Sequence, residues 1–275
     1  MAVDTCYRHP NRETGVRCSN CERPICPDCM TTTPVGMRCP ECARQRTKVK
    51  TMRSMTSEPR LTYVLIGISV LAFLGESFSG GGIGSSGTLF DEGALYRAAI
   101  QDGEYWRLIT AGFLHDGLAH LLFNMLGLYI LGTILEPAIG TPRFAVIYFV
   151  SLLTGSFGAL LQEDIGATVG ASGAVFGLMG ATAVVMWNRG LNILESGLGF
   201  WIILNLVISF LPGLNISWGG HIGGLVGGTL CALVLVELRQ RTRIPEAAAM
   251  LICVALGASA VAGSLTLEPP AQLPF

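Results

Sequence analysis

Charged residues are scarce in this chain of 275 residues: Asp, Glu, Lys and Arg make up 13% of it, against 51% hydrophobic residues. A soluble domain of this length needs more polar surface to cover itself, so the lipid bilayer is the expected solvent. The net charge is only −1, and no basic stripe occurs outside one linker, so nucleic acid is not an expected partner. The first sixty residues lack an apolar run, so no cleavable signal peptide is expected.

Seven apolar stretches are long enough to cross the roughly 30 Å hydrocarbon core of a bilayer when tilt is allowed for. We therefore expect an all-α polytopic membrane protein. The predicted spans lie near residues 61–78, 118–138, 142–161, 171–188, 197–211, 219–238 and 247–267.

Lys and Arg are unevenly distributed between the two sides of the membrane that the seven predicted spans define. Residues 1–60 hold eleven of the eighteen, and five more arginines lie between residues 143 and 243 on the same side. Only Arg97 and Arg107 fall on the opposite side. Because cytoplasmic loops carry the excess of basic residues, the N-terminus is predicted to be cytoplasmic in a multi-pass protein of the cell membrane.

The N-terminal region contains four pairs of Cys or His residues, each with two residues between its members. Each pair can hold one edge of a tetrahedral metal ion, so eight ligands predict two zinc ions in closed, structural sites. Disulfides are the alternative, but seven cysteines and one histidine on a cytoplasmic face argue against them. The expected ligands are Cys6, His9, Cys18, Cys21, Cys26, Cys29, Cys39 and Cys42.

This spacing resembles the B-box type of zinc finger, although its last pair is Cys-Cys where B-boxes usually carry histidines. The resemblance implies cross-bracing, in which the first and third pairs share one ion and the second and fourth share the other. The spacing itself leaves sequential pairing open. The module is expected to span residues 1–43 and to bind an unknown cytoplasmic partner.

A basic linker is expected at residues 44–60, followed by a six-helix core at 61–240 and a seventh helix with a tail at 241–275. The linker either touches anionic lipid headgroups or serves only as a topology signal.

Four polar residues stand out within the spans, where each polar group needs an explanation. His120 and Asn124 lie four residues apart, on one helical face near the start of the second span. Ser172 opens the fourth span and His221 opens the sixth. Singly, each has an ordinary alternative as a packing motif or an interhelical hydrogen bond. By the predicted topology, however, all lie at outer helix ends, as does His115, which favours one site opening to the outer face.

The pattern fits serine hydrolase chemistry that needs no cofactor. A histidine must approach a serine hydroxyl to about 2.6–3.2 Å to accept its proton. Small residues at every fourth position allow such an approach of the fourth and sixth spans. Glu136 lies sixteen residues, or about 24 Å along a helix, from His120, so a Ser-His dyad of Ser172 and His221 is expected rather than a triad. Phe176 is expected to stack on the imidazole. The small residues are Gly173, Gly177 and Ala181 in one span and Gly220, Gly224 and Gly228 in the other.

An oxyanion hole is expected from the backbone N–H of Ser172, the amide of Asn124 and the His120 ring, because all three are hydrogen-bond donors. Water must also enter. An outer-end cavity capped by the loop 212–218 would admit it.

These motifs closely resemble the rhomboid intramembrane proteases over roughly residues 60–240. The resemblance implies a six-helix core that cleaves transmembrane protein substrates in the bilayer, with Ser172 as nucleophile, His221 as base, and His120 and Asn124 as oxyanion donors. It implies no role for the seventh span or the zinc module. Further matching motifs are Trp106-Arg107, Phe113-x-His115, Glu136-x-x-x-Gly140 and the glycines after His221.

Two other classes compete with this interpretation. Rhomboid-like pseudoproteases bind membrane proteins with the same scaffold but lack the dyad, and both Ser172 and His221 are present here. A seven-span channel or transporter is disfavoured because no polar stripe runs through the full depth of any span.

Overall fold

The computed structural model divides into two compact units, Met1–Met55 and Thr56–Phe275, and each is described by itself. Most of the predicted basic linker 44–60 and the first part of the loop 212–218 lie outside the described residues. The structure describes residues 4–44, 58–78, 87–162, 166–211 and 216–267.

In its described residues 4–44, the N-terminal unit has two small antiparallel hairpins, a short 3-10 helix and a short α-helix. Its buried cluster consists almost entirely of cysteine side chains, with Ile25 as the one large aliphatic member. So small an apolar core does not hold a fold together unaided, so bound metal is expected to stabilise this unit. The elements are β1 (Asp4–Thr5), β2 (Glu13–Thr14), η1 (Pro27–Cys29), β3 (Thr31–Thr33), β4 (Gly36–Arg38) and α1 (Pro40–Arg44).

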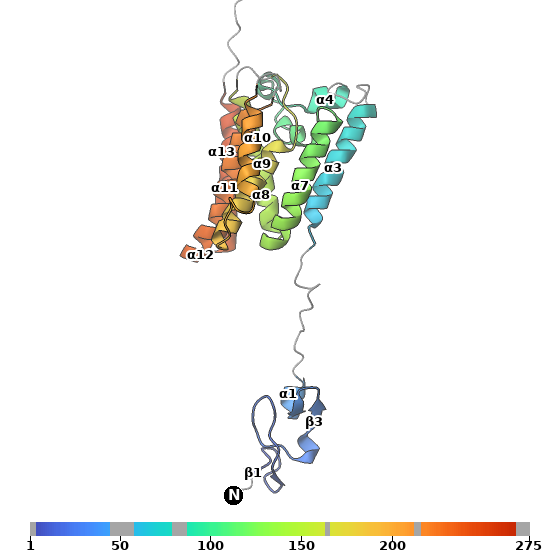
Figure 1. Ribbon diagram of the computed structural model, residues 1–275, viewed down its shortest axis with the longest axis vertical. Coiled ribbons are helices and arrows are strands. Elements are labelled where there is room, and N and C mark those ends of the chain that lie inside the picture. Colours follow the sequence, from blue (N-terminus) through green and yellow to red (C-terminus); the bar gives the residue numbers. More distant parts are fainter. Residues whose placement is uncertain (1–3, 45–57, 79–86, 163–165, 212–215, 268–275) are drawn as a thin grey trace, which may run out of the picture. The chain divides into compact units, whose positions relative to one another are not determined.

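The second unit is α-helical, and each of the seven predicted spans forms a helix (Figure 1). For six of the spans the observed ends lie within about two residues of the predicted ones, because hydropathy sets where a helix can leave the membrane. The sixth span differs: α11 ends at Ala232, and the helical run continues to Thr242, past the predicted end at 238. Continuing from α11, η4 (Leu233–Leu238) is a π-helical segment and leads into α12 (Arg239–Thr242). The seven helices are α3 (Arg60–Glu76), α7 (Leu118–Ile139), α8 (Thr141–Leu160), α9 (Ser172–Asn188), α10 (Leu198–Ser209), α11 (Trp218–Ala232) and α13 (Glu246–Leu265).

Four of these helices are long and apolar enough to cross a membrane: α7, α8, the continuous run Trp218–Thr242, and α13. The chain is therefore an integral membrane protein with an all-α architecture. The helices α9 and α10 are apolar but shorter. That α3, α9 and α10 each cross the membrane stays a prediction.

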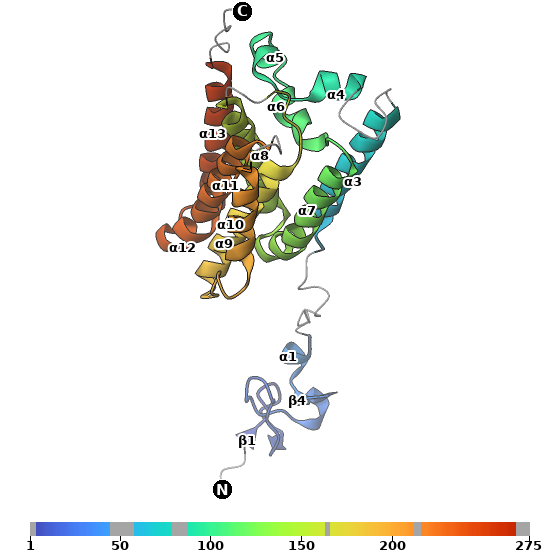
Figure 2. The ribbon, with the colours of Figure 1, turned by 45° about the horizontal axis from the view of Figure 1, so that its top comes forward.

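Short helices between α3 and α7 gather at one end of the bundle (Figure 2). Arg107 is buried there and donates to the carbonyl oxygens of Asp91 and Ala94, while the Trp106 indole donates to the Glu92 carbonyl oxygen. These contacts tie the Trp106-Arg107 motif to α4 and so help to shape the segment between α3 and α7. The short helices are α4 (Thr88–Gly93), α5 (Arg97–Gln101), α6 (Arg107–Thr110) and η3 (Ala111–Phe113).

The helices α8, α9 and α11 pack against one another at the centre of the bundle. Glycines line their contacts: a Cβ on Gly228 would clash with the Gly177 backbone, and a Cβ on Gly158 would clash with the Gly219 carbonyl oxygen. The predicted close approach of the fourth and sixth spans is therefore confirmed. Around it lies a core of large buried side chains, including Phe144, Ile147, Tyr148 and Leu178.

Glu136 joins the ends of α3 and α7. Its carboxylate accepts hydrogen bonds from the backbone N–H groups of Leu61 and Thr62 at 3.1 and 2.9 Å, and from the Thr62 and Thr141 hydroxyls at 2.8 Å each. The first N–H groups of a helix have no partner within that helix, so a carboxylate at this position stabilises the start of α3.

The seventh helix, α13, is held to the core by ion pairs at its start and by side-chain packing along its length. Arg143 donates two hydrogen bonds to the Glu246 carboxylate, at 3.0 and 2.9 Å, and Arg239 lies 3.4 Å from the same carboxylate. Further along, Gly257 faces Val150 and Gly263 faces Phe157 of α8.

Candidate active site

Ser172 is the first residue of α9, and the turn before it requires glycine. Gly170 has φ +118°, a conformation that L side chains rarely adopt, and a Cβ there would lie 2.7 Å from the His120 ring. The Gly170 N–H donates to the Ala111 carbonyl oxygen at 2.9 Å, which fixes the turn to η3. The serine hydroxyl is thereby presented at the start of a helix.

His221 lies in the first turn of α11, which Ser217 caps by accepting the Gly220 N–H at 3.1 Å. The His221 ring stacks on Phe176, with ring centroids 4.1 Å apart and planes 18° apart, so the predicted stacking is confirmed. Phe176 is one helical turn after Ser172 on the same face of α9. The imidazole therefore lies over the face of α9 that carries the serine.

The backbones of α9 and α11 touch beside these two residues. A Cβ on Gly224 would clash with the Gly173 carbonyl oxygen, and a Cβ on Gly173 would lie 3.3 Å from the Gly220 carbonyl oxygen. In the part of the chain that the structure describes, no hydrogen bond joins the Ser172 hydroxyl to His221. Such bonds are often long without substrate and tighten in the reacting complex.

His120 and Asn124 face the turn that precedes Ser172. A Cβ added at Gly170 would lie 2.7 Å from His120 Nε2 and 3.8 Å from Asn124 Nδ2, so both side chains lie against this turn. Asn124 Nδ2 donates one hydrogen to the His120 carbonyl oxygen at 3.0 Å, and its second N–H stays available. The four predicted site residues thus lie on three helices around one helix start.

His115 and Glu76 lie next to this group of four residues. His115 is fully buried, and its ring meets the His120 ring edge to face at 5.2 Å. The His115 backbone N–H donates to the Glu76 carboxylate at 3.5 Å. Glu76 was missed at the sequence level because an acidic residue at the end of an apolar run usually marks a membrane boundary.

Ser209 was also missed. It is the last residue of α10, and its Oγ lies 2.6 Å from His221 Nδ1. A single serine in an apolar helix gives no signal in the sequence, because such hydroxyls commonly bond to a carbonyl of their own helix.

The predicted zinc ligands form two groups, and in each the four ligand atoms lie within 4.8 Å of one another. Cys6, His9, Cys26 and Cys29 form one group, and Cys18, Cys21, Cys39 and Cys42 form the other. The first and third pairs thus meet, as do the second and fourth, which is the cross-braced arrangement that the B-box resemblance implied.

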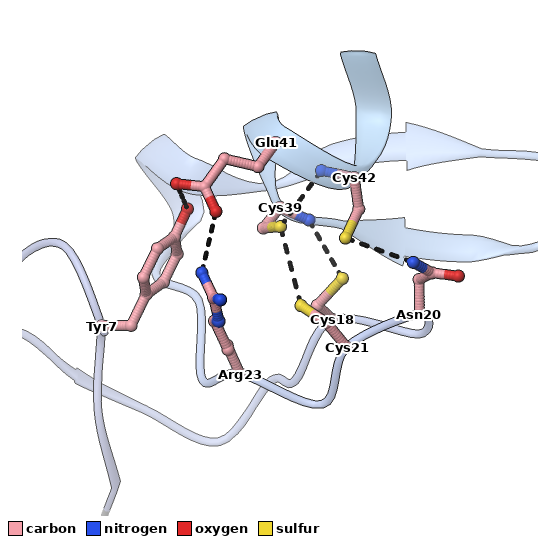
Figure 3. Close-up of polar contacts among 8 residues, drawn as sticks. All are labelled: Tyr7, Cys18, Asn20, Cys21, Arg23, Cys39, Glu41 and Cys42. Atoms are coloured by element: carbon pink, nitrogen blue, oxygen red, sulfur yellow. Dashed lines mark hydrogen bonds and ion pairs between the residues drawn. The ribbon is translucent and has the colours of Figure 1, made fainter. Parts of the chain in front are cut away.

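The ligand spacing fits tetrahedral zinc. Cys21 Sγ and Cys39 Sγ are 3.8 Å apart, close to the sulfur separation of about 3.8 Å in a tetrahedron with Zn–S bonds of about 2.3 Å. In the second group, N–H donors already face sulfur: the Asn20 amide donates to Cys42, and the Cys39 backbone to Cys18, both at 3.3 Å (Figure 3). Such donors favour the thiolate form that binds metal.

Polar contacts close the loops around the second group (Figure 3). The Arg23 guanidinium and the Tyr7 hydroxyl both donate to the Glu41 carboxylate, at 2.8 and 3.4 Å. Burial and the Glu41 charge raise the pKa of Tyr7 to about 12, so the phenol keeps its proton as a donor.

Comparisons with known proteins show which family the chain resembles. A family model described as the Rhomboid domain matches residues 102–238, a range that includes His120, Asn124, Ser172 and His221. The chain is 39% identical over 181 residues to the rhomboid protease GluP of Bacillus subtilis, covering 65% of this chain and 35% of GluP.

Two further relatives show the same likeness. RHOMBOID-like protein 5 of Arabidopsis thaliana is 38% identical over 156 residues, which cover 54% of this chain and 50% of the relative. The putative rhomboid protease YdcA of Bacillus subtilis is 34% identical over 149 residues, which cover 53% and 75%. The chain thus spans half or less of the length of the first two relatives.

Proposed function

The chain belongs to the rhomboid family, and on that premise we propose that it is an intramembrane serine endopeptidase that hydrolyses peptide bonds of transmembrane proteins. One observation carries the proposal: the starts of α9 and α11 touch through glycine, with Ser172 and His221 beside the contact.

In the proposed reaction the Ser172 Oγ attacks the scissile carbonyl carbon while His221 accepts the hydroxyl proton. The charge that develops on the carbonyl oxygen is stabilised by the Ser172 backbone N–H, the free N–H of Asn124 and the His120 ring. His221 then donates its proton to the leaving amine, and water hydrolyses the acyl-enzyme by the same steps.

Two features of the described residues support these roles: the place of Ser172 at the start of a helix, and the stacking of Phe176 on the imidazole. Ser172 is at a helix start, where backbone N–H groups have no partner within the helix and point toward developing negative charge. Phe176 holds the imidazole by stacking, so orientation of the base does not depend on a carboxylate.

The substrates are proposed to be single-span proteins cut near the outer membrane face, where small residues interrupt their helix. A scissile carbonyl inside an intact helix is already hydrogen-bonded and shielded from attack. The eleven Lys and Arg of the first sixty residues support a cytoplasmic N-terminus, and with it a site at the outer face, because cytoplasmic segments carry the excess of basic residues.

The two proposed zinc ions are structural and take no part in catalysis. All eight ligand positions are filled by protein side chains, which leaves no open position for water or substrate. The module is proposed to hold a surface for a cytoplasmic partner.

Purified full-length protein, mixed in detergent or vesicles with a model single-span substrate, tests the proposal. We expect cleavage by the native protein and none by Ser172→Ala, which keeps the helical fold by circular dichroism. A fluorophosphonate probe should label the native protein at Ser172 only. A folded native protein that binds the substrate without cutting it would support the pseudoprotease alternative.

A further inference from the structure

Ser209 differs from the rest of its helix. Of the residues in α10, only Gly199 and Ser209 are buried, and the other ten remain at least partly exposed. Ser209 is 4% exposed and lies at the end of α10 that adjoins the start of α11. The one polar side chain that α10 buries is therefore placed beside the proposed catalytic base.

The Ser209 hydroxyl makes two contacts. Its Oγ lies 2.7 Å from the Asn205 carbonyl oxygen and 2.6 Å from His221 Nδ1. A carbonyl oxygen can only accept, and a hydroxyl has one proton, so that proton is donated to Asn205. Ser209 Oγ then accepts a hydrogen bond from His221, which requires the proton of the neutral imidazole to be on Nδ1.

We propose that Ser209 is a positioning residue of the dyad: it holds His221 in the tautomer that leaves Nε2 unprotonated and able to accept the Ser172 proton. The inference rests on the proposed function. Stacking on Phe176 fixes the plane of the ring, and the bond to Ser209 fixes its rotation within that plane. Together the two contacts determine which nitrogen is the base.

The usual structural role of a buried serine, a hydrogen bond to a carbonyl oxygen of its own helix, does not account for the contact between Ser209 and His221. Ser264 in α13 shows what a buried serine does without one: it is 2% exposed and donates to the Ala260 carbonyl oxygen at 2.9 Å. Ser209 makes the equivalent bond to Asn205 and also meets the imidazole. The extra contact orients His221, as a carboxylate does in a triad, but with a neutral acceptor.

The proton balance is simple. During attack the Ser172 proton moves to His221 Nε2, and the imidazolium keeps its Nδ1–H bonded to Ser209 Oγ. A hydrogen bond from a charged donor is stronger than one from a neutral donor, so Ser209 stabilises the imidazolium more than the neutral ring. It therefore favours transfer of the Ser172 proton to His221.

The kinetic test compares Ser209→Ala, Ser209→Thr and the matched control Ser264→Ala in the single-span cleavage assay. Ser209→Ala is expected to lower kcat by about ten- to a hundredfold, with little change in KM, because the side chain does not touch the substrate. The acidic limb of its pH profile is expected to move to lower pH, because the imidazolium loses a partner. Ser209→Thr keeps the hydroxyl and is expected to restore kcat, and Ser264→Ala is expected to match the native protein.

A spectroscopic test does not depend on activity. In protein labelled with ¹⁵N-histidine, the His221 ring is assigned by its loss in His221→Gln. We expect a protonated Nδ1 and an unprotonated Nε2 in the native protein and in Ser172→Ala, and a mixture of tautomers in Ser209→Ala. This readout holds even if no cleavage is found, so failure of the proposed function is distinguishable from failure of this inference.

Three results would overturn the inference: a native His221 protonated on Nε2, a Ser209→Ala variant with native kcat and pH profile, or a Ser209→Ala variant altered only in KM. The last would assign Ser209 to substrate binding. If Ser209→Ala unfolds, the tautomer in Ser209→Thr and in the native protein still decides the question.

Discussion

At the residue scale, the proposed oxyanion donors depend on a glycine as much as on their own chemistry. Gly170 leaves space that a Cβ would close against the His120 ring, and its positive φ turns the chain into α9. Any other residue there would push the turn away from His120 and displace Ser172. The same turn therefore sets the positions of the proposed donors and of the proposed nucleophile.

Asn124→Ala removes one of the proposed donors to the developing oxyanion. We expect kcat to fall by about a hundred- to a thousandfold, equivalent to about 2.7–4 kcal/mol of transition-state stabilisation. The measurement is steady-state cleavage of the single-span substrate. Asn192→Ala, an asparagine exposed between α9 and α10, is the control and should leave kcat unchanged. A native kcat in Asn124→Ala would remove this residue from the oxyanion hole.

Phe176→Leu keeps an apolar side chain of moderate size but loses the flat face on which His221 stacks. Stacked aromatic pairs contribute about 0.5–1.5 kcal/mol beyond buried area, so we expect kcat to fall by about three- to tenfold. Phe176→Tyr should retain most of the activity because the ring stays. Equal loss in both variants would show that packing volume, and not stacking, matters at this position.

At the scale of elements, the active site depends on two helices whose backbones are in contact. The small residues of α9 and α11 allow this approach, and a serine side chain is too short to meet a histidine across an ordinary helix separation. The glycines beside the proposed dyad are therefore expected to affect catalysis although their own side chains take no part in it.

Gly224→Ala tests this contact. The added methyl would clash with the Gly173 carbonyl oxygen, so the helices must separate at the dyad. We expect a loss of stability of about 1–3 kcal/mol, measured by thermal unfolding in detergent, together with a strong loss of cleavage. The matched control is Gly67→Ala in α3, where a Cβ meets nothing within 4 Å. Equal behaviour of the two variants would contradict the close-approach argument.

At the scale of the whole molecule, two units with different sources of stability share one chain. The helical unit buries a continuous apolar core, whereas the N-terminal unit buries mainly cysteines. Metal binding to such a unit is coupled to its folding, because the ligands are brought together only in the folded state. The two units are therefore expected to respond differently to a chelator.

Treatment with a strong chelator is expected to release two zinc ions per chain, in line with the two ligand groups. The N-terminal unit should then become sensitive to protease, while cleavage of the single-span substrate continues at the native rate. Zinc is measured with a chromogenic indicator and cleavage in the same sample. Activity lost in step with zinc would show that the module acts on the catalytic site.

The sequence alone predicted most of the fold, since hydropathy over each span is a local property. The bounds of α7, for example, are set by the apolar run itself. Four of the proposed site residues could also be named from the sequence, because the chain has only four histidines and Ser172 opens a span directly before a glycine. The eight zinc ligands could be named for a similar reason: their two-residue spacing is a local geometric requirement.

Only the tertiary structure decided which distant groups meet. The spacing of the cysteines left cross-braced and sequential pairing open, and the fold brings Cys21 to Cys39. Ser209 and Glu76 carried no signal in the sequence, yet one contacts His221 and the other His115. Local patterns specify helices and ligand pairs because they depend on neighbours in the chain. Contacts between helices depend on how whole faces pack, and no short pattern contains that information.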